Sequence, residues 1–495
     1  MNEVRKRSKK NPLLRFVSLL FATILPLPVI VAVILSVPNM YEETFLGALA
    51  PKVERIKSID EPKIVVVGGS SVAFGLDSKM LSEHTGYEVV NFGLYATLGT
   101  RIMLDLSREY INQGDIVIIA PELDKQTLSL YFNGEAIWQA ADSDLSLLQK
   151  VHPDNYMDLA ATLPEYLSTV LSRVAKGEGA ISPTGIYRKD SFNEYGDIIY
   201  PREYNIMTAG YDVNQVLTLS KDIYDAEFVD YLNEYINDIT NKGAKAYYTF
   251  CPLNQSALAP ETTESVISDF YQHVAEMIEC PIISDPNSLI LHEGYFYDTN
   301  FHLNDAGVII RTANLIDDIL RAEGRTDYVA IQIPEIPKRP ESDKNETWEE
   351  NKWSTMFYYE EFGDGLSIVG VKEEAKNLEA LELPYMADGK PVLVVSEEAF
   401  SECKNLKELT IYENITLIEN GAFKGANKLE YLHMRRETAE DLEVGAELFE
   451  GASKNLRICF YSETSFQNFV SGYWWGIHGE RMIPFNDSAT STQMN

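Results

Sequence analysis

The sequence predicts an α/β protein in three parts: an N-terminal transmembrane helix, a three-layer α/β/α domain with a parallel sheet, and a C-terminal repeat solenoid. Three observations predict these parts. An apolar run follows a basic segment, short apolar strands alternate with helical stretches between about residues 63 and 323, and one apolar line recurs three times after residue 398. A chain of 495 residues is long enough for more than one domain.

Composition excludes several classes of function. The chain has 42 Lys and Arg against 75 Asp and Glu, which gives a formal net charge of −33. We therefore expect no nucleic-acid partner, because neutralising phosphates requires basic patches. Four cysteines without a CxxC pair argue against a disulfide-stapled scaffold and against a zinc ribbon. Neither an HExxH motif nor a carboxylate cluster appears, so we expect no metal and no other cofactor.

The N-terminus predicts a membrane anchor. Residues 1–12 are basic and are expected to form a cytoplasmic tail, and residues 13–37 are expected to be the transmembrane signal anchor. The apolar run after Arg15, about 22 residues, is long enough to cross a hydrocarbon core of roughly 30 Å. The protein would then lie in the cell membrane as a single-pass protein, with its N-terminus inside and its bulk extracellular. The alternatives are a cleaved signal peptide, whose apolar region is normally about 7–15 residues, and a buried soluble helix.

Residues 45–325 are expected to form the α/β domain. Apolar, β-branched runs predict strands at 63–68, 88–91, 115–120, 244–250 and 281–283. The spacing of apolar residues predicts helices at 77–84, 98–112, 228–242, 262–279 and 305–321. This alternation is typical of a parallel sheet covered by helices. Residues 124–220 interrupt it and are expected to be an insertion above the carboxyl edge of the sheet, which either shapes a substrate site or is a structural excursion.

A linker and a repeat domain follow. Residues 326–352 are expected to be the linker, because three prolines prevent a helix and the rest is strongly polar. Residues 353–485 are expected to form the second domain, where three lines superpose, starting at Ala399-Phe400, Ala422-Phe423 and Leu448-Phe449. A period in the twenties with leucines three residues apart is typical of a leucine-rich solenoid. Residues 355–480 resemble the BspA-type leucine-rich repeats that are common on bacterial surfaces, and the resemblance implies a protein or surface ligand.

Three smaller features leave alternatives open. Cys403 takes a position that Ala fills in another line, so a buried small side chain is expected and not a reactive thiol. The run Tyr473-Trp474-Trp475 is either a sugar-stacking platform or a hydrophobic cap on the last repeat. Cys251 and Cys280 flank one predicted helix and could come within roughly 7 Å, the reach of a disulfide. Free thiols remain the expectation for this pair.

Candidate catalytic residues lie in three turns. Gly68 to Gly75 is a glycine-rich turn with Ser70 and Ser71, where a hydroxyl can lie near backbone N–H groups that suit an oxyanion. A serine that caps the next helix is the alternative. The second turn, Asn91 to Gly93, follows a neighbouring strand, and both turns would meet at one edge of the sheet. The third turn contains His302 with Asp298 four residues upstream, which suits a base with an orienting acid or a structural histidine.

Together the three turns resemble the SGNH (GDSL-type) hydrolase superfamily over residues 60–325. Gly69 to Gly75 is similar to its first block, with Ser70 in place of the usual Asp; Gly93 matches the second block, and His302 with Leu303, Asn304 and Gly307 matches the last. The resemblance implies a flavodoxin-like α/β/α domain and a Ser71–His302–Asp298 catalytic set. It also implies an oxyanion hole made by the backbone N–H groups of Ser71 and Gly93.

Two positions depart from that pattern. The last block normally places its carboxylate three residues before the histidine, where this chain has Thr299. Asp298 can reach the imidazole only through a bulged turn, and a Ser–His dyad is the alternative. The third block normally supplies an Asn as an oxyanion donor, and here Glu122 follows the third strand instead. A negative charge there disfavours an oxyanion unless the carboxyl group points away or is protonated.

The sequence therefore predicts a membrane-anchored, extracytoplasmic esterase or O-acyltransferase. The resemblance is nearest to membrane-anchored members that act on cell-envelope polymers, which implies an acylated glycan or cell-envelope polymer as substrate. It also implies a possible membrane acyltransferase partner that delivers the acyl group. The alternative is a surface adhesin or scaffold with leucine-rich repeats and a catalytically inactive SGNH-like domain.

Overall fold

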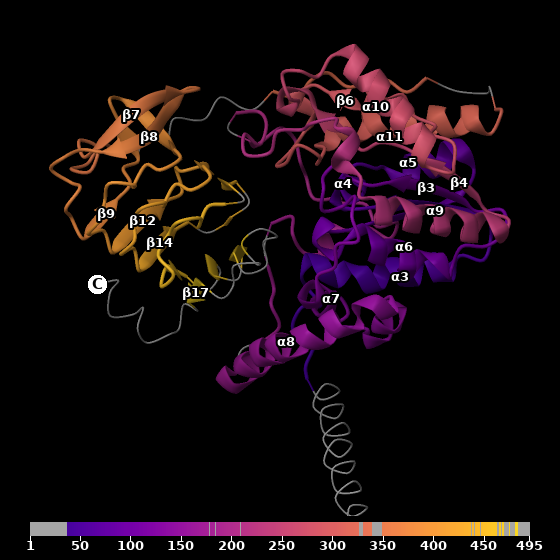
Figure 1. The fold of residues 1–495 in the computed structure, drawn as a ribbon, viewed down its shortest axis with the longest axis horizontal. Coiled ribbons are helices and arrows are strands. Elements are labelled where there is room, and N and C mark those ends of the chain that lie inside the picture. The colour runs from indigo at the N-terminus through magenta and orange to yellow at the C-terminus, as the bar shows by residue number, and fades with distance from the viewer. Residues whose placement is uncertain are drawn as a thin grey trace, which may run out of the picture.

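The computed structural model describes residues 37–325 except 178, 184 and 208, then 330–338, and then 349–483 except 437, 440, 446, 463, 464, 467, 470–474 and 476–480. The described elements form an α/β lobe and a repeat lobe (Figure 1). The predicted cytoplasmic tail, 1–12, and the predicted anchor, 13–37, lie outside the described residues except for Val37. Among the helices that are described, none is both long enough and apolar enough to cross a bilayer.

A four-stranded parallel sheet lies at the centre of the α/β lobe, in the order β2-β1-β3-β4. The strands agree with the first four predicted strands. They are Lys63–Gly68 (β1), Glu88–Gly93 (β2), Ile116–Ala120 (β3) and Lys245–Tyr248 (β4). The strand expected at 281–283 is not a full strand and makes one bridge, from Ile282 to Tyr248. A separate short ladder pairs Leu253–Asn254 (β5) with Ile290–Leu291 (β6).

Side chains of each strand alternate between two hydrophobic clusters, one on each face of the sheet. In β1, Val65 and Val67 point into the larger cluster, and Ile64 and Val66 into the smaller one. Helices α3 (Leu49–Ser58), α6 (Thr100–Arg108), α9 (Ala226–Asn241) and α10 (Glu264–Met277) contribute to the larger cluster. Helices α5 (Ser78–Thr85) and α11 (Asp305–Ala322) cover the opposite face. This layering explains why β3 is apolar at every position and β1 is apolar from Ile64 to Val67.

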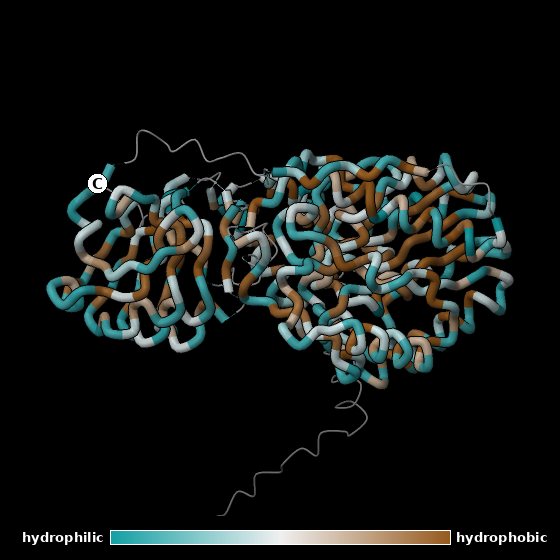
Figure 2. The backbone as a smooth tube through the Cα atoms, turned by 90° about the horizontal axis from the view of Figure 1, so that it is seen from above, coloured by the Kyte–Doolittle hydropathy of each residue, from teal (hydrophilic) through white to brown (hydrophobic). Residues whose placement is uncertain are grey.

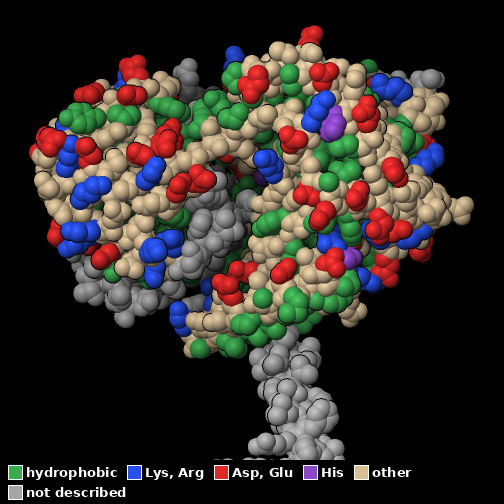
Figure 3. Space-filling view, viewed as in Figure 1, with side chains coloured by type: hydrophobic (Ala, Val, Ile, Leu, Met, Phe, Trp, Pro, Cys, Tyr) green, Lys and Arg blue, Asp and Glu red, His purple; other side chains and the backbone are tan. Residues whose placement is uncertain are grey.

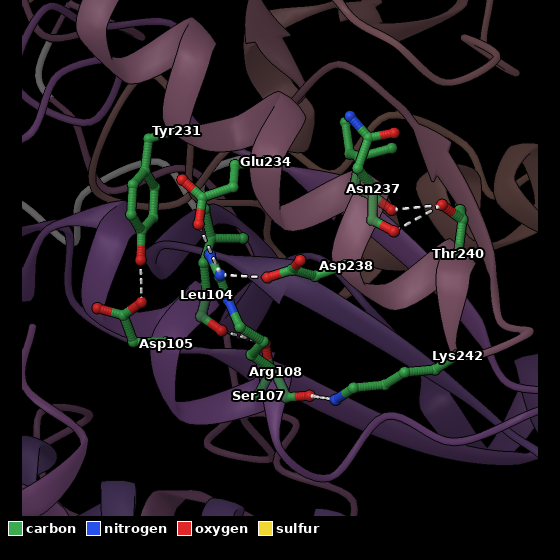
Figure 4. A network of polar contacts seen from close by, with 11 residues as sticks. Leu104, Asp105, Ser107, Arg108, Tyr231, Glu234, Asn237, Asp238, Thr240 and Lys242 are labelled. Atoms are coloured by element: carbon green, nitrogen blue, oxygen red, sulfur yellow. Dashed lines mark hydrogen bonds and ion pairs between the residues drawn. The ribbon is translucent and has the colours of Figure 1, made fainter.

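Polar contacts join the helices of one layer (Figure 4). Arg108 of α6 lies between two carboxylates of α9, and its Nη1 is 2.5 Å from an oxygen of Asp238 and 3.4 Å from one of Glu234. The phenol of Tyr231 donates to Asp105 across the same interface. These contacts join α6 to α9 at the surface of the lobe and stabilise the packing of this helical layer.

The predicted insertion, residues 124–220, carries α7 (Gly134–Ala140) and α8 (Tyr156–Lys176) and otherwise consists mostly of 3-10 turns and irregular chain. Its backbone contacts two of the predicted site turns. The N–H of Ile198 donates to the carbonyl of Ala73 at 3.3 Å, and the N–H of Ile206 donates to the carbonyl of Tyr297 at 2.9 Å. The insertion therefore connects the first turn with the last one.

The repeat lobe consists of short strands in two sheets, and its strands pair in parallel except for the antiparallel pairs β7–β8 and β10–β11. The first has the order β15-β13-β11-β8-β7 with β10 beside β11, and the second has the order β17-β16-β14-β12-β9. In Figure 2 the strands of this lobe lie side by side, with hydrophobic positions toward its interior. The strands are Phe357–Phe362 (β7), Gly365–Val371 (β8), Ala380–Glu382 (β9), Met386–Ala387 (β10), Lys390–Val395 (β11), Glu408–Tyr412 (β12), Leu417–Ile418 (β13), Tyr431–Arg435 (β14), Glu443–Val444 (β15), Arg457–Phe460 (β16) and Met482–Ile483 (β17).

The recurring phenylalanines form a ladder through the repeat lobe. The rings of Phe400 and Phe423 stack at 6.1 Å, and those of Phe423 and Phe449 at 6.5 Å. Cys403 is buried, as its position in the repeat predicts. Trp475 is also buried and packs against Phe469 at 4.9 Å, which favours the hydrophobic cap over a sugar platform for this one residue. Tyr473 and Trp474 lie outside the described residues.

All four cysteines are free thiols, so the Cys251–Cys280 disulfide does not form. Burial raises the pKa of both thiols to about 12, which keeps them protonated.

Part of the expected linker belongs to the α/β lobe. Ile331 packs against the smaller hydrophobic cluster, and the hydroxyl of Tyr295 donates to the carbonyl of Pro334 at 3.0 Å. The hydrophobic clusters of the two lobes share no residue among those described. Because each lobe has its own hydrophobic core, we expect the two lobes to fold independently.

A chain that ends after residue 338 is expected to keep the α/β lobe folded, because that end retains the contacts of Ile331 and Pro334. Its thermal unfolding should superpose on the corresponding transition of the full-length protein in differential scanning calorimetry. A chain ending at Arg325 is the matched control and should unfold at a lower temperature, since it lacks those contacts. Aggregation of the longer truncated chain would show that the lobes depend on each other.

Candidate functional site

Three strand ends pack closely at the carboxyl edge of the sheet. Gly68 pairs with Gly93 of β2 on one side and with Ala120 of β3 on the other. A Cβ atom on Gly68 would strike the carbonyl of Ala120, and one on Gly93 would lie 2.5 Å from Cβ of Val72. Only glycine fits at these two positions, and the close approach brings the turns after β1, β2 and β3 together.

The candidate nucleophile Ser71 lies in the short helix α4 (Ser70–Ala73), directly after β1. Its side chain is fully buried, and within the described part of the chain its hydroxyl has no hydrogen-bond partner. An unpaired buried hydroxyl is costly, which makes Ser71 a position that calls for a functional explanation.

Glu122 lies against this turn from the end of β3. Its Oε1 accepts the backbone N–H of Ser71 at 2.5 Å and the hydroxyl of Ser70 at 2.9 Å. A Cβ atom on Gly69 would lie 2.5 Å from Oε2 of the same carboxyl group, so a side chain at position 69 would displace Glu122 from this position. Burial, followed by the charge of Asp124, raises the pKa of Glu122, while the Ser71 N–H and His302 act in the opposite direction.

Both predicted oxyanion donors therefore have partners in this structure. The N–H of Ser71 donates to Glu122, and the N–H of Gly93 donates to Oδ1 of Asn91 at 3.1 Å. Asn91 in turn donates from Nδ2 to the carbonyl of Val72 at 2.9 Å, which ties the second turn to the first.

His302 and Asp298 lie in contact in the third turn. Nδ1 of His302 is 2.7 Å from Oδ1 of Asp298, an arrangement that leaves Nε2 as the ring nitrogen free to take a proton. The turn bulges as the four-residue spacing requires: the N–H of His302 donates to Oγ1 of Thr299 at 3.0 Å, and its carbonyl accepts the N–H of Tyr297 at 2.9 Å. Asn304 caps the following helix α11 by accepting the N–H of Gly307 at 3.0 Å.

Phe74 connects the histidine to the serine turn. Its ring stacks on the imidazole of His302, with 3.9 Å between centroids and 6° between planes. Phe74 follows Ser71 by three residues, at the end of the same helical turn. The structure thus brings the first and third turns side by side, but no hydrogen bond joins Ser71 Oγ to His302 among the described residues.

Two side chains of the insertion complete this site, and no sequence motif marks either of them. The phenol of Tyr187 donates to Oδ2 of Asp298, the carboxylate oxygen that His302 does not use. Burial, with the charge of Asp298, raises the pKa of Tyr187 well above 10, so the phenol stays a donor. Arg202 lies over the Phe74 ring at 5.4 Å and donates to the Phe74 carbonyl at 3.0 Å.

A buried arginine lies behind the serine turn. Arg311 of α11 is almost fully buried and donates to the carbonyl of Phe250 at 3.2 Å, and its Nε and Nη2 have no partner within the described chain. Burial lowers its pKa to about 10, and the carboxyl group of Glu122 opposes that shift. Over the described residues, no group of His, Cys, Asp and Glu side chains is arranged to hold a metal ion.

Comparison with known proteins identifies the C-terminal part of the chain. No curated protein matches the sequence significantly. Residues 374–470 match the BspA type leucine rich repeat region in six copies. The match agrees with the repeats expected over 355–480 and with the stacked, mostly parallel strands from β9 onward. Residues 374–470 are therefore BspA-type leucine-rich repeats, and a surface or protein-interaction role is consistent with them.

Proposed function

We propose that residues 60–325 are an SGNH-type serine esterase or O-acyltransferase. The contact that carries the proposal is the Asp298–His302 pair stacked on Phe74, one helical turn from Ser71. An imidazole with a buried carboxylate on Nδ1 is the usual base for a serine nucleophile. The turns after β1 and β2 supply backbone N–H groups at the same edge of the sheet.

In the reaction, Ser71 Oγ attacks the ester carbonyl and its proton passes to Nε2 of His302. The imidazolium is stabilised by Asp298, and the negative charge on the former carbonyl oxygen is held by backbone N–H groups. The alcohol leaves with the proton from His302 and an acyl-Ser71 remains. Water or a glycan hydroxyl then attacks the acyl group, its proton passes to His302, and Ser71 is released, which gives hydrolysis or transfer respectively.

Glu122 decides whether the site is competent. Its Oε1 accepts the hydrogen bond from the N–H of Ser71 and so takes the position in which an oxyanion would lie. A carboxylate in this position competes with the reaction, and a protonated or displaced carboxyl group does not. We propose that the active form has Glu122 away from the Ser71 N–H.

The proposed setting is the outer face of the cell membrane. The basic tail and the apolar run of residues 13–37 support a single-pass anchor with the rest of the chain outside. The substrate would be an acylated glycan or cell-envelope polymer, with a membrane acyltransferase as the donor partner. The repeats would bind a protein or surface ligand.

A second function is favoured by the closed state of the site. The hydroxyl of Ser71 is buried and its N–H is occupied, as expected for an inactive domain. The protein would then be a surface adhesin or scaffold, whose ligand binds the repeats.

A serine-reactive fluorophosphonate separates the two functions. For the enzyme we expect labelling of the folded protein, with the adduct located on the Ser71 peptide by mass spectrometry. Ser71→Ala should abolish labelling, and His302→Ala should slow it at least about 100-fold, the range for a lost general base. A folded wild-type protein that stays unlabelled would favour the adhesin.

The pH dependence of stability tests the state of Glu122. Because its pKa is raised above the ordinary value of 4.5, the folded state binds this proton more tightly than the unfolded state. The stabilisation that this proton gives to the folded state is fully present below pH 4.5 and is lost as the pH rises through the raised pKa of Glu122. Glu122→Gln removes the titrating group, so its stability relative to wild type should increase with pH, by about 1.4 kcal/mol for each unit of the shift.

Urea unfolding between pH 4 and pH 8 measures this difference. The exposed Glu165→Gln in α8 is the matched control and should leave the pH profile of wild type unchanged. Parallel profiles for wild type and Glu122→Gln would contradict a raised pKa at this position.

Tyr187→Phe tests whether the insertion serves the catalytic pair. Loss of the phenol leaves Oδ2 of Asp298 without its donor. We expect labelling of Ser71 to slow about 10-fold, as for other outer partners of a functional side chain. Tyr166→Phe removes a similar phenol from Asp142 in the same insertion and should leave the labelling rate unchanged. Equal rates for both variants would make Tyr187 only a packing residue.

A further inference from the structure

Helix α8 exposes an apolar stripe along its whole length. Met157 is 79 % exposed and Leu171 is 45 % exposed. At helical spacing, one line of exposed residues contains no charge; it is made of Met157, Ala161, Pro164, Ser168, Leu171 and Ala175. Figure 3 shows apolar side chains gathered along the lower edge of the α/β lobe, where Figure 1 places α8.

The other two faces of α8 have different partners. Leu159, Tyr166 and Val170 are buried in the larger hydrophobic cluster, so packing against the lobe leaves the stripe uncovered. Asp158, Glu165 and Lys176 are exposed and lie together on a polar face beside the stripe. A helix with a buried face, a charged face and an exposed apolar face has more apolar surface than its own fold uses.

The described chain begins beside this helix. Val37 packs against the larger cluster, and the rings of Tyr41 and Tyr166 lie 6.1 Å apart. The N–H of Tyr41 donates to Asp142 at 2.8 Å, and the carbonyl of Met40 accepts the N–H of Ile181 at 2.8 Å. These contacts hold the chain directly after the predicted anchor, residues 13–37, beside α8 and the segments that follow α7 and α8. A chain that leaves the bilayer at residue 37 therefore places α8 close to the membrane surface.

We infer that the apolar stripe of α8 rests in the lipid interface beside the anchor. The inference rests on the membrane setting of the proposed function and adds an orientation to it. The helix is suited to lie on a membrane and not to cross it, because none of the described helices is apolar enough to span one. The insertion that carries α8 also carries Tyr187, so the element that contacts the site would be fixed at the membrane surface.

The test uses the full-length protein reconstituted in phosphatidylcholine vesicles. A bimane fluorophore is attached to Met157→Cys or Leu171→Cys, in a Cys280→Ser background because Cys280 is the one cysteine that is not buried. Ile199→Cys and Val216→Cys are matched controls, since these apolar residues are 60 % and 61 % exposed outside α8. Each sample is compared in ordinary lipid and in brominated lipid, which quenches a fluorophore only on contact.

We expect brominated lipid to remove about half of the emission at positions 157 and 171, because side chains of such a face lie roughly 5–10 Å into the interface. Emission at 199 and 216 should not change. Adding Leu171→Glu, which places a charge within the stripe, should reduce the quenching at position 157. If the α8 probes are not quenched in protein that remains in the vesicles, the inference is overturned and the membrane anchor is retained. This result would assign the stripe to a protein partner and not to lipid. Protein that does not remain in the vesicles would overturn the anchor and the inference together.

Discussion

The close packing of three parallel strand ends is the constraint on which the candidate site depends. Gly68, Gly93 and Ala120 lie side by side in register, and a side chain on either glycine would collide with its neighbours. This approach places the amide of Ser71 beside the ends of β2 and β3. The Phe74 ring stacks on the imidazole of His302 and so places the third turn beside the serine turn. The insertion joins the same two turns from outside, through Ile198 on the first and Ile206 on the last.

The same packing explains why Glu122 lies at the centre of the candidate site. Glu122 follows the end of β3 by two residues and lies against the serine turn, where the N–H of Ser71 is its nearest donor. Burial disfavours its charge, and the buried Arg311 lies near enough for its charge to act on Glu122 without a direct hydrogen bond. The enzyme and the adhesin therefore differ in one physical respect, which is whether this carboxyl group can leave the amide of Ser71.

Local patterns predicted the elements, and long-range contacts set the site. The runs of apolar residues were sufficient for β1 to β4, because buried parallel strands need few other signals. The bulged turn that brings Asp298 to His302 was one of two alternatives that the sequence left open, the other being a Ser–His dyad. Tyr187 was not foreseeable, since it lies 111 residues from Asp298 in a segment without periodicity. The 281–283 run makes only one bridge to β4 and does not extend it into a ladder. The chain near Pro334 packs on the α/β lobe although its composition is that of a linker.

A crystal structure of the protein after exposure to a phosphonate ester tests the central claim most directly, which is that the three turns form one acyl-transfer site. The account predicts a phosphorus atom bonded to Ser71 Oγ, with His302 Nε2 within hydrogen-bond reach of a phosphonyl or ester oxygen. It also predicts that the N–H of Ser71 has exchanged Glu122 for the phosphonyl oxygen. An unmodified Ser71 in a well-ordered crystal, with Glu122 still bound to its amide, would contradict the account and assign the α/β lobe to binding.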